Sequence, residues 1–252
     1  MHGVPGVNIG GKNINNLRYA DDTALIADSQ EKLQELVSIL VRESESKGLR
    51  VNVSKTQVLV VSKGDTQVPA NIVVNDQRLK QVQNFKYLGS IISEDGRSDS
   101  DINARIAIAK TAFNKVKPLM TNRSIPISLR RRFLKSYVWS TMLYGCEAWN
   151  ISNAMQRKIE AAEMWFFRRT LRISWTEHAT NESVLQRAGA RREMMRSIRQ
   201  RQMRFLGHVI RDGQLENVCV TGRIEGRRGR GRPRLKYMDT LARAVGRMSP
   251  EE

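Results

Sequence analysis

Two adjacent acidic residues, Asp21 and Asp22, suggest the clearest chemistry in this sequence. They separate two short runs rich in apolar and β-branched residues, 17–20 and 23–27, which predicts a tight hairpin with the acidic pair at its tip. Neighbouring carboxylates repel each other, and a bound Mg²⁺ would neutralise them because it prefers oxygen ligands. The alternative is that aspartate is a common turn residue and the pair merely joins two strands.

The residues around this pair resemble the catalytic hairpin of reverse transcriptases from non-LTR (LINE-type) retrotransposons. The resemblance is carried by residues 17–27, LRYADDTALIA, and continues into a helix that a capping-box pattern at 28–31 and helical apolar spacing predict over about 30–47. It implies an RNA-directed DNA polymerase, a nucleotidyltransferase of a transposable element that uses two-metal catalysis. Asp21 and Asp22 would then be catalytic residues and Mg²⁺ ligands.

Three further segments of the chain resemble segments of the same family, and they occur along the chain in the order that the family has. Residues 48–56, GLRVNVSKT, resemble the next palm motif, in which Lys55 would assist the departing pyrophosphate; an ordinary solvated lysine is the alternative. Residues 143–149, LYGCEAW, resemble the segment after the thumb. A third segment resembles the hairpin that grips the primer end, with Phe85 and Tyr87 expected on one face of a strand, although a core strand is also compatible. Its residues are Phe85, Lys86, Tyr87, Leu88 and Gly89.

The sequence departs from the family pattern before this hairpin. Members of the family carry another metal-binding aspartate and the nucleotide-holding fingers upstream, whereas no acidic residue precedes Asp21. Asp28 is explained by its place at a helix start. Because two carboxylates from one tip cannot hold two ions, we expect this chain by itself to be inactive as a polymerase. A non-catalytic nucleic-acid-binding protein derived from such an element is the alternative function, and an aggregating relic is a third.

Composition points to a polyanionic partner. The formal charge is +18, from 43 basic and 25 acidic residues, and the first hundred residues contribute none of the excess because they hold as many acidic as basic side chains. The partners expected are an RNA template with a DNA primer, or duplex DNA. No stretch has the length and apolarity of a membrane span, so no membrane partner is expected.

Hydrophobic periodicity predicts an α+β fold, strand-rich first and helical afterwards, and the resemblance implies a partial polymerase palm followed by a helical thumb and a basic helical region. Short strand-like runs and one helix occupy 1–98, the palm with its primer-grip hairpin, and helical periodicity begins at Asp99. We expect thumb-like helices over 99–149, a basic helical region over 150–221 and an Arg/Gly-rich arm with the C-terminal segment over 222–252.

Arginines concentrate near the C-terminal end of the chain. On a predicted helix over 192–210 several of them alternate with apolar residues, so one face can pack while another contacts phosphates; a solvated charged face is the alternative. The residues are Arg196, Arg199, Arg201 and Arg204. Residues 228–234, RGRGRPR, resemble an AT-hook core that inserts arginines into an A·T-rich minor groove. A polybasic tail or a nuclear-import signal competes with that interpretation for Arg228, Arg230, Arg232 and Arg234.

The remaining candidate site residues are the cysteines, histidines and tryptophans. Two cysteines form no disulfide framework, which indicates a reducing, intracellular compartment; we expect the nucleus, with the cytoplasm as the alternative. The cysteines and histidines lack zinc-binding spacing, so no zinc is expected. The tryptophans could stack on bases, but helical spacing and apolar neighbours favour a core position for all of them, namely Trp139, Trp149, Trp165 and Trp175.

Overall fold

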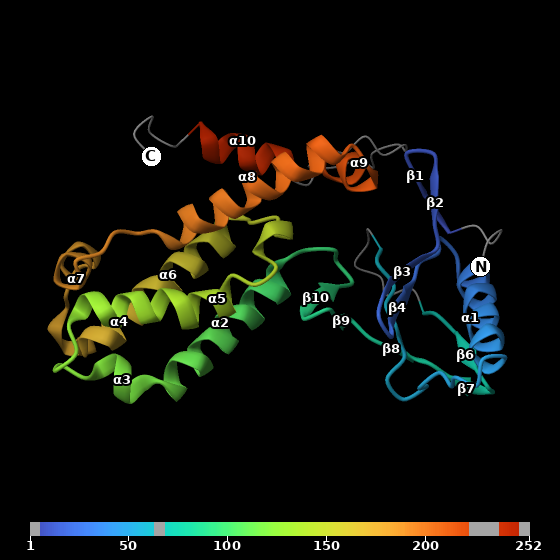
Figure 1. Ribbon diagram of the computed structural model, residues 1–252, viewed down its shortest axis with the longest axis horizontal. Helices are drawn as coiled ribbons and strands as arrows, with labels where there is room; N and C mark the ends of the chain where they lie inside the picture. The colour runs from blue at the N-terminus through green and yellow to red at the C-terminus, as the bar shows by residue number, and fades with distance from the viewer. Residues whose placement is uncertain (1–5, 63–68, 222–236, 247–252) are drawn as a thin grey trace. The chain divides into compact units, whose positions relative to one another are not determined.

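Strands fill the first part of the chain and helices the rest in the computed structural model, which describes residues 6–62, 69–221 and 237–246 (Figure 1). The predicted α+β class is confirmed. The chain divides into two units: unit 1 comprises Met1–Arg97 and Val209–Arg234, and unit 2 comprises Ser98–His208 and Leu235–Glu252. The finer division into palm, thumb, basic region and arm stays a prediction. None of the described helices combines the length and apolarity that a membrane crossing requires.

The described part of unit 1 consists of paired short strands and two helices. Each of its sheets has two strands: β1–β2, β3–β4, β6–β7 and β9–β10 are antiparallel, and β5–β8 is parallel. Turn residues fix the hairpins, as at Asn75 and Asp76, whose positive φ angles join β6 to β7. The elements are β1 (Val7–Ile9), β2 (Lys12–Ile14), β3 (Asn16–Tyr19), β4 (Asp22–Leu25), α1 (Gln30–Glu45), β5 (Gln57–Val58), β6 (Val73–Val74), β7 (Gln77–Arg78), β8 (Lys80–Gln81), β9 (Asn84–Tyr87), β10 (Ser90–Ser93) and α9 (Leu215–Thr221).

Helix α1 holds these strands together. Ser29 caps the helix by accepting a hydrogen bond from the Lys32 amide, whereas the capping-box pattern over 28–31 predicted Asp28 in this role; Asp28 instead pairs with the Lys32 side chain. The apolar face of α1 packs into a small core, and Gln34 supplies the bonds that a neighbouring strand would give: its amide nitrogen donates to the Val73 carbonyl at 2.9 Å, and its oxygen accepts from the Val73 amide at 2.8 Å. The buried members of this core are Val37, Val58, Ala70, Ile72, Val74 and Leu79.

Unit 2 is helical (Figure 1). The helical periodicity predicted from Asp99 onward is confirmed, and a π-helical turn, η1, lies between α4 and α5. The elements are α2 (Asp99–Lys115), α3 (Lys117–Thr121), α4 (Ile127–Phe133), η1 (Leu134–Trp139), α5 (Ser140–Met142), η2 (Cys146–Ala148), α6 (Asn153–Leu171), η3 (Trp175–Glu177), α7 (Asn181–Ala188), α8 (Met194–Asp212, whose last residues belong to unit 1) and α10 (Tyr237–Val245).

The core of unit 2 is large and contains buried polar groups at helix junctions. Its largest fully buried side chains include Phe113, Phe166 and Phe167. Arg130 of α4 is 8% exposed and donates to three carbonyls, those of Ile125 (3.0 Å), Met120 (3.1 Å) and Thr170 (2.9 Å). One guanidinium therefore fixes α4 against the ends of α3 and α6.

A buried carboxyl joins α6 to α8 in a similar way. Glu163 is 1% exposed, and its Oε1 accepts from the backbone amides of Glu193 (2.9 Å) and Met194 (3.1 Å) at the start of α8. Burial raises the pKa of the Glu163 carboxyl above its ordinary value, although these amides act in the opposite direction. The first turn of α8 thus obtains the acceptor that its amides need.

We predict that Arg130→Ala destabilises unit 2 by about 2–4 kcal/mol, because three carbonyls lose their donor in a buried site. All four tryptophans lie within unit 2, so urea unfolding followed by tryptophan fluorescence reports on this unit. Arg132→Ala is the control, since Arg132 lies on the same helix and is exposed. Equal midpoints for the two variants would contradict the role given to Arg130.

Glu163 gives a second prediction, on pH dependence. Because its pKa is higher in the folded protein than in the unfolded chain, the folded state binds more protons, and the stability that this contributes is lost as the pH rises from about 4.5 through the raised value. Glu163→Gln keeps an oxygen acceptor for both amides but cannot ionise, so we expect a shallower fall in unfolding free energy above pH 4.5. Urea unfolding at a series of pH values measures this, with the exposed Glu182→Gln as the control expected to follow the wild type.

Candidate functional site

The aspartate pair lies at the exposed tip of a two-residue hairpin. Strands β3 and β4 pair with Tyr19 opposite Asp22, so Ala20 and Asp21 form the turn. Ala20 adopts a φ of 52°, a conformation that costs a residue with a Cβ about 1–2 kcal/mol. Asp21 and Asp22 are both exposed. The predicted position of the acidic pair at a hairpin tip is confirmed, and the backbone there is strained.

The base of this hairpin is fixed to the rest of unit 1. The Ile26 amide donates to the Asn15 carbonyl at 2.9 Å, which extends the pairing one step beyond the ladder. Leu25, the last residue of β4, packs against the small core together with Leu33 of α1. The tip therefore extends from an anchored base, and its two carboxylates are held close together by the chain itself.

A second hairpin carries the predicted primer grip. Tyr87 of β9 pairs with Ser90 of β10, and both turn residues, Leu88 (φ 47°) and Gly89 (φ 84°), have positive φ, as a type I′ turn requires. The rings of Phe85 and Tyr87 are stacked, with centroids 6.5 Å apart and planes 23° from parallel. The prediction that these two rings share one face of the strand is confirmed.

The two hairpins make contact within unit 1. The Tyr87 hydroxyl donates to the Leu17 carbonyl at 3.5 Å, a long hydrogen bond that joins β9 to the strand leading into the aspartate tip. Leu17 and Tyr19 on that strand are 46% and 67% exposed. The strand that leads to the acidic tip thus carries exposed apolar and aromatic side chains and contacts the hairpin with the stacked rings.

Lys55 lies elsewhere in unit 1. Asn52 organises its turn by accepting hydrogen bonds from the Lys55 amide at 3.1 Å and the Ser54 hydroxyl at 2.7 Å. The Lys55 side chain is exposed, and none of the contacts found among the described residues joins it to Asp21 or Asp22. The pyrophosphate-assisting role of Lys55 stays a prediction.

The aspartate tip can supply part of a magnesium site. Mg²⁺ is commonly held by one or two carboxylates together with phosphate oxygens and water, and Asp21 and Asp22 offer such a pair. Among the residues that the structure describes, no three Asp, Glu, His or Cys side chains cluster in a way that could hold a metal. The donor set fits one ion completed by ligands from a substrate.

The arginines of α8 do not share one role. Arg196 and Arg204 are exposed, as phosphate contacts require. Arg199, however, is 9% exposed and donates to the side chain of Gln202 at 2.8 Å, so its inclusion among the phosphate-binding residues is corrected: it packs inside unit 2. Arg201 is half-buried and donates to the Leu143 carbonyl at 3.2 Å. The helical period places Arg199 and Arg201 on the face of α8 that packs inside unit 2. The sequence alone does not show that this face offers hydrogen-bond partners for two guanidinium groups.

Two other predictions concern arginines and tryptophans. Arg228, Arg230, Arg232 and Arg234 of the AT-hook-like segment lie outside the described residues. Trp139 and Trp149 are buried as predicted, but Trp175 is 90% exposed, so its assignment to the core is wrong.

A group of cationic side chains around a pocket beside Trp175 was not predicted from the sequence. The spacing of Arg168, Arg169 and Arg172 on one side of a helix end was the available signal.

Comparison with known proteins shows what this chain is similar to. Residues 3–92 match the family described as reverse transcriptase (RNA-dependent DNA polymerase). A transposon-derived protein of Caenorhabditis elegans is 27% identical over 249 residues, which cover 94% of this chain and 87% of that protein. No solved structure matches this chain.

The matched segment contains both hairpins, helix α1 and Lys55. Residues 3–92 are thus of reverse-transcriptase type, a class whose substrates are nucleic acids. The similarity to the transposon-derived protein extends over most of the chain, including unit 2.

We predict that the aspartate tip binds a divalent cation when a primer–template supplies phosphate oxygens. Mn²⁺, followed by its paramagnetic resonance signal, serves as the probe for Mg²⁺. Asp21→Asn with Asp22→Asn should abolish this binding, because two of the oxygen ligands lose their charge. Asp28→Asn is the control: that carboxylate already pairs with Lys32 at 2.7 Å. Equal Mn²⁺ binding by wild type and the double variant would refute the metal role of the tip.

Proposed function

We propose that this chain is part of the RNA-directed DNA polymerase of a non-LTR (LINE-type) retrotransposon. One observation carries the proposal: within the matched segment 3–92, the hairpin that carries the exposed Asp21–Asp22 tip is joined at β3 to the Phe85–Gly89 hairpin through the hydrogen bond from Tyr87 to Leu17. A hairpin whose carboxylates can hold metal is thereby joined to a hairpin whose aromatic residues can hold a nucleic-acid end. Because such an element copies itself into DNA, we also assign the protein to the nucleus.

In this proposal Asp21 and Asp22 hold Mg²⁺, which would activate a primer hydroxyl and stabilise the leaving pyrophosphate. The stacked rings of Phe85 and Tyr87, with the rigid I′ turn at Leu88 and Gly89, would hold the primer end in position. Exposed Lys86 would contact the primer backbone. Lys55 would donate a proton to the pyrophosphate.

We further propose that this chain by itself does not extend a primer. Two-metal transfer needs ligands for two ions, each of which takes near-octahedral oxygen coordination. The described residues provide one pair of carboxylates at the tip and no cluster of three. Losing a metal ligand from such a site lowers the rate by orders of magnitude, because positioning and charge neutralisation supply most of the barrier reduction.

A non-catalytic nucleic-acid-binding protein is the second candidate function. The charge distribution favours it: the whole excess of +18 falls after residue 100, beyond the matched segment. Exposed Arg196 and Arg204 of α8 belong to this excess. In this function a bound RNA or DNA strand would be retained without being extended.

Binding and extension assays on the full chain test these proposals. We expect a labelled RNA–DNA primer–template to bind with log K falling linearly with log salt, and no incorporation of nucleotides. Arg196→Ala with Arg204→Ala should reduce the salt slope by roughly 1–2, whereas Arg132→Ala with Arg157→Ala, the same charge loss at exposed sites outside α8, should change it less.

The outcomes are distinct. Extension that disappears with Asp21→Asn would overturn the proposed inactivity and support polymerase ancestry. Salt-independent binding would contradict both candidate functions.

A further inference from the structure

Trp175 is held in an exposed position by its own turn. It begins the 3₁₀ turn η3, and its side chain is 90% exposed. Ser174 and Glu177 form a complete capping box: the Ser174 side chain accepts from the Thr176 amide at 3.3 Å, and the Glu177 carboxylate accepts from the Ser174 amide at 3.0 Å. A large apolar ring is thus fixed toward solvent instead of packing into the nearby core.

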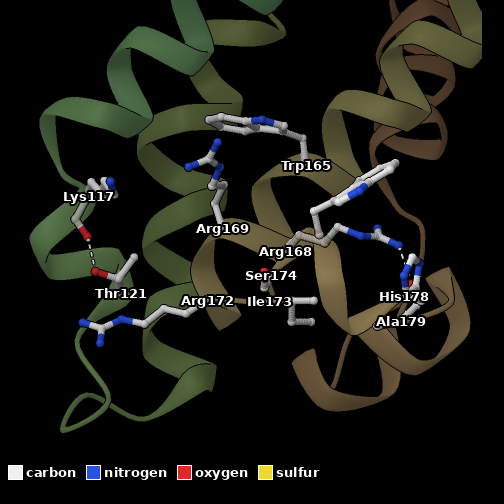
Figure 2. A pocket seen from close by; sticks show the side chains of 11 residues that line it. Lys117, Thr121, Trp165, Arg168, Arg169, Arg172, Ile173, Ser174, His178 and Ala179 are labelled. Carbon is white, nitrogen blue, oxygen red and sulfur yellow. Dashed lines mark hydrogen bonds between the residues drawn. The ribbon is translucent and has the colours of Figure 1, made fainter.

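A pocket of about 760 Å³ lies beside this turn, between α3, the end of α6 and the segment leading to α7 (Figure 2). Its lining contains four permanent cations and no carboxylate: Lys117, Arg168, Arg169 and Arg172. Trp165 and Trp175 also line it. The pocket therefore combines concentrated positive charge with two indole rings.

Two of the four cations are fixed by other contacts. Arg168 donates to the Ala179 carbonyl at 2.9 Å and to the Asn181 side chain at 3.0 Å, and Figure 2 shows it directed toward the Ala179 side of the pocket. Arg169 lies over the Trp165 ring, 5.2 Å from its centroid (Figure 2). These two side chains shape the wall and contribute charge without needing a ligand.

The other two cations, Lys117 and Arg172, belong to none of the ion pairs found among the described residues. Arg172 ends α6 in the left-handed region, with φ 58°, and its charge together with burial lowers the pKa of nearby Arg130. The neighbouring acid, Glu177, is already engaged by Arg187 at 3.1 Å. Positive charge here is left uncompensated, which favours an anionic ligand.

We propose that this pocket binds single-stranded nucleic acid, with a base stacked on Trp175 and adjacent phosphates at Arg172 and Lys117. A stacking platform beside cations is how proteins hold single strands without reading their sequence. A duplex cannot present the face of an internal base to the indole, so the exposed ring selects unpaired nucleotides. The site lies outside the segment 3–92 and does not rest on the chemistry proposed for the aspartate tip.

Anisotropy of a fluorescein-labelled oligodeoxythymidine tests the site in the full chain. Trp175→Ala should weaken binding about tenfold at constant salt, since one base loses its stacking partner. Arg172→Ala with Lys117→Ala should reduce the salt slope by about 1.4. The matched controls are Tyr137→Ala, an exposed aromatic outside the pocket, and Arg157→Ala with Lys158→Ala on the same helix as Arg172. Both controls should bind close to the wild type.

Each outcome decides the proposal. Wild-type affinity and slope in both pocket variants would overturn it, as would equal weakening by the controls. Loss of affinity for duplex as large as for single strand would remove the stacking role. Displacement of the oligonucleotide by an acidic peptide at a much lower concentration than by unlabelled oligodeoxythymidine would show that the pocket serves another class of partner. Trp175→Phe, which keeps a ring, should retain most of the affinity and separates stacking from folding.

Discussion

The packing of α1 against the short strands of unit 1 is the interaction on which the aspartate tip depends. Ladders of two strands are marginally stable in water by themselves, and every ladder in the described part of unit 1 has only two. The small core around Ile72 and Val74, together with the two hydrogen bonds between Gln34 and Val73, adds the stability that two-stranded ladders lack. Leu25 packs against this core and so anchors the base of the hairpin that carries Asp21 and Asp22. A loosened α1 would separate the carboxylates from the second hairpin without altering either carboxylate.

Unit 2 combines a large buried core with many cationic side chains. Some of its charges are used internally: Arg130 fixes α4 through carbonyls, Glu163 caps the start of α8, and Arg199 contacts Gln202. Such groups are costly to bury without partners and position helices firmly when partnered. Of the remaining cations, Lys117 and Arg172 belong to none of the ion pairs found among the described residues. Their mutual repulsion would be relieved by a bound polyanion.

The sequence predicted most helices and both functional hairpins because their signals are local. Capping residues, apolar periods and positive-φ turn residues are set by near neighbours, as at Ser29 and Gly89. It failed where the outcome depends on tertiary contacts. Arg199 is buried because Gln202 and the carbonyls behind it can satisfy polar groups there, and Trp175 is exposed on a short capped 3₁₀ turn rather than placed on a long amphipathic helix. Neither fact follows from hydrophobic spacing.

Asp21 and Asp22 form a local acidic tip, whereas unit 2 carries an excess of cations, so the two regions act differently on a nucleic acid. A phosphate backbone is attracted by the cations of unit 2 but repelled by Asp21 and Asp22 unless a cation lies between them. The affinity for nucleic acid should therefore come mainly from unit 2, while the tip adds little until a divalent ion is present. For the same reason, loss of Asp21 and Asp22 need not remove nucleic-acid binding, so a protein of this design could hold a strand without these carboxylates.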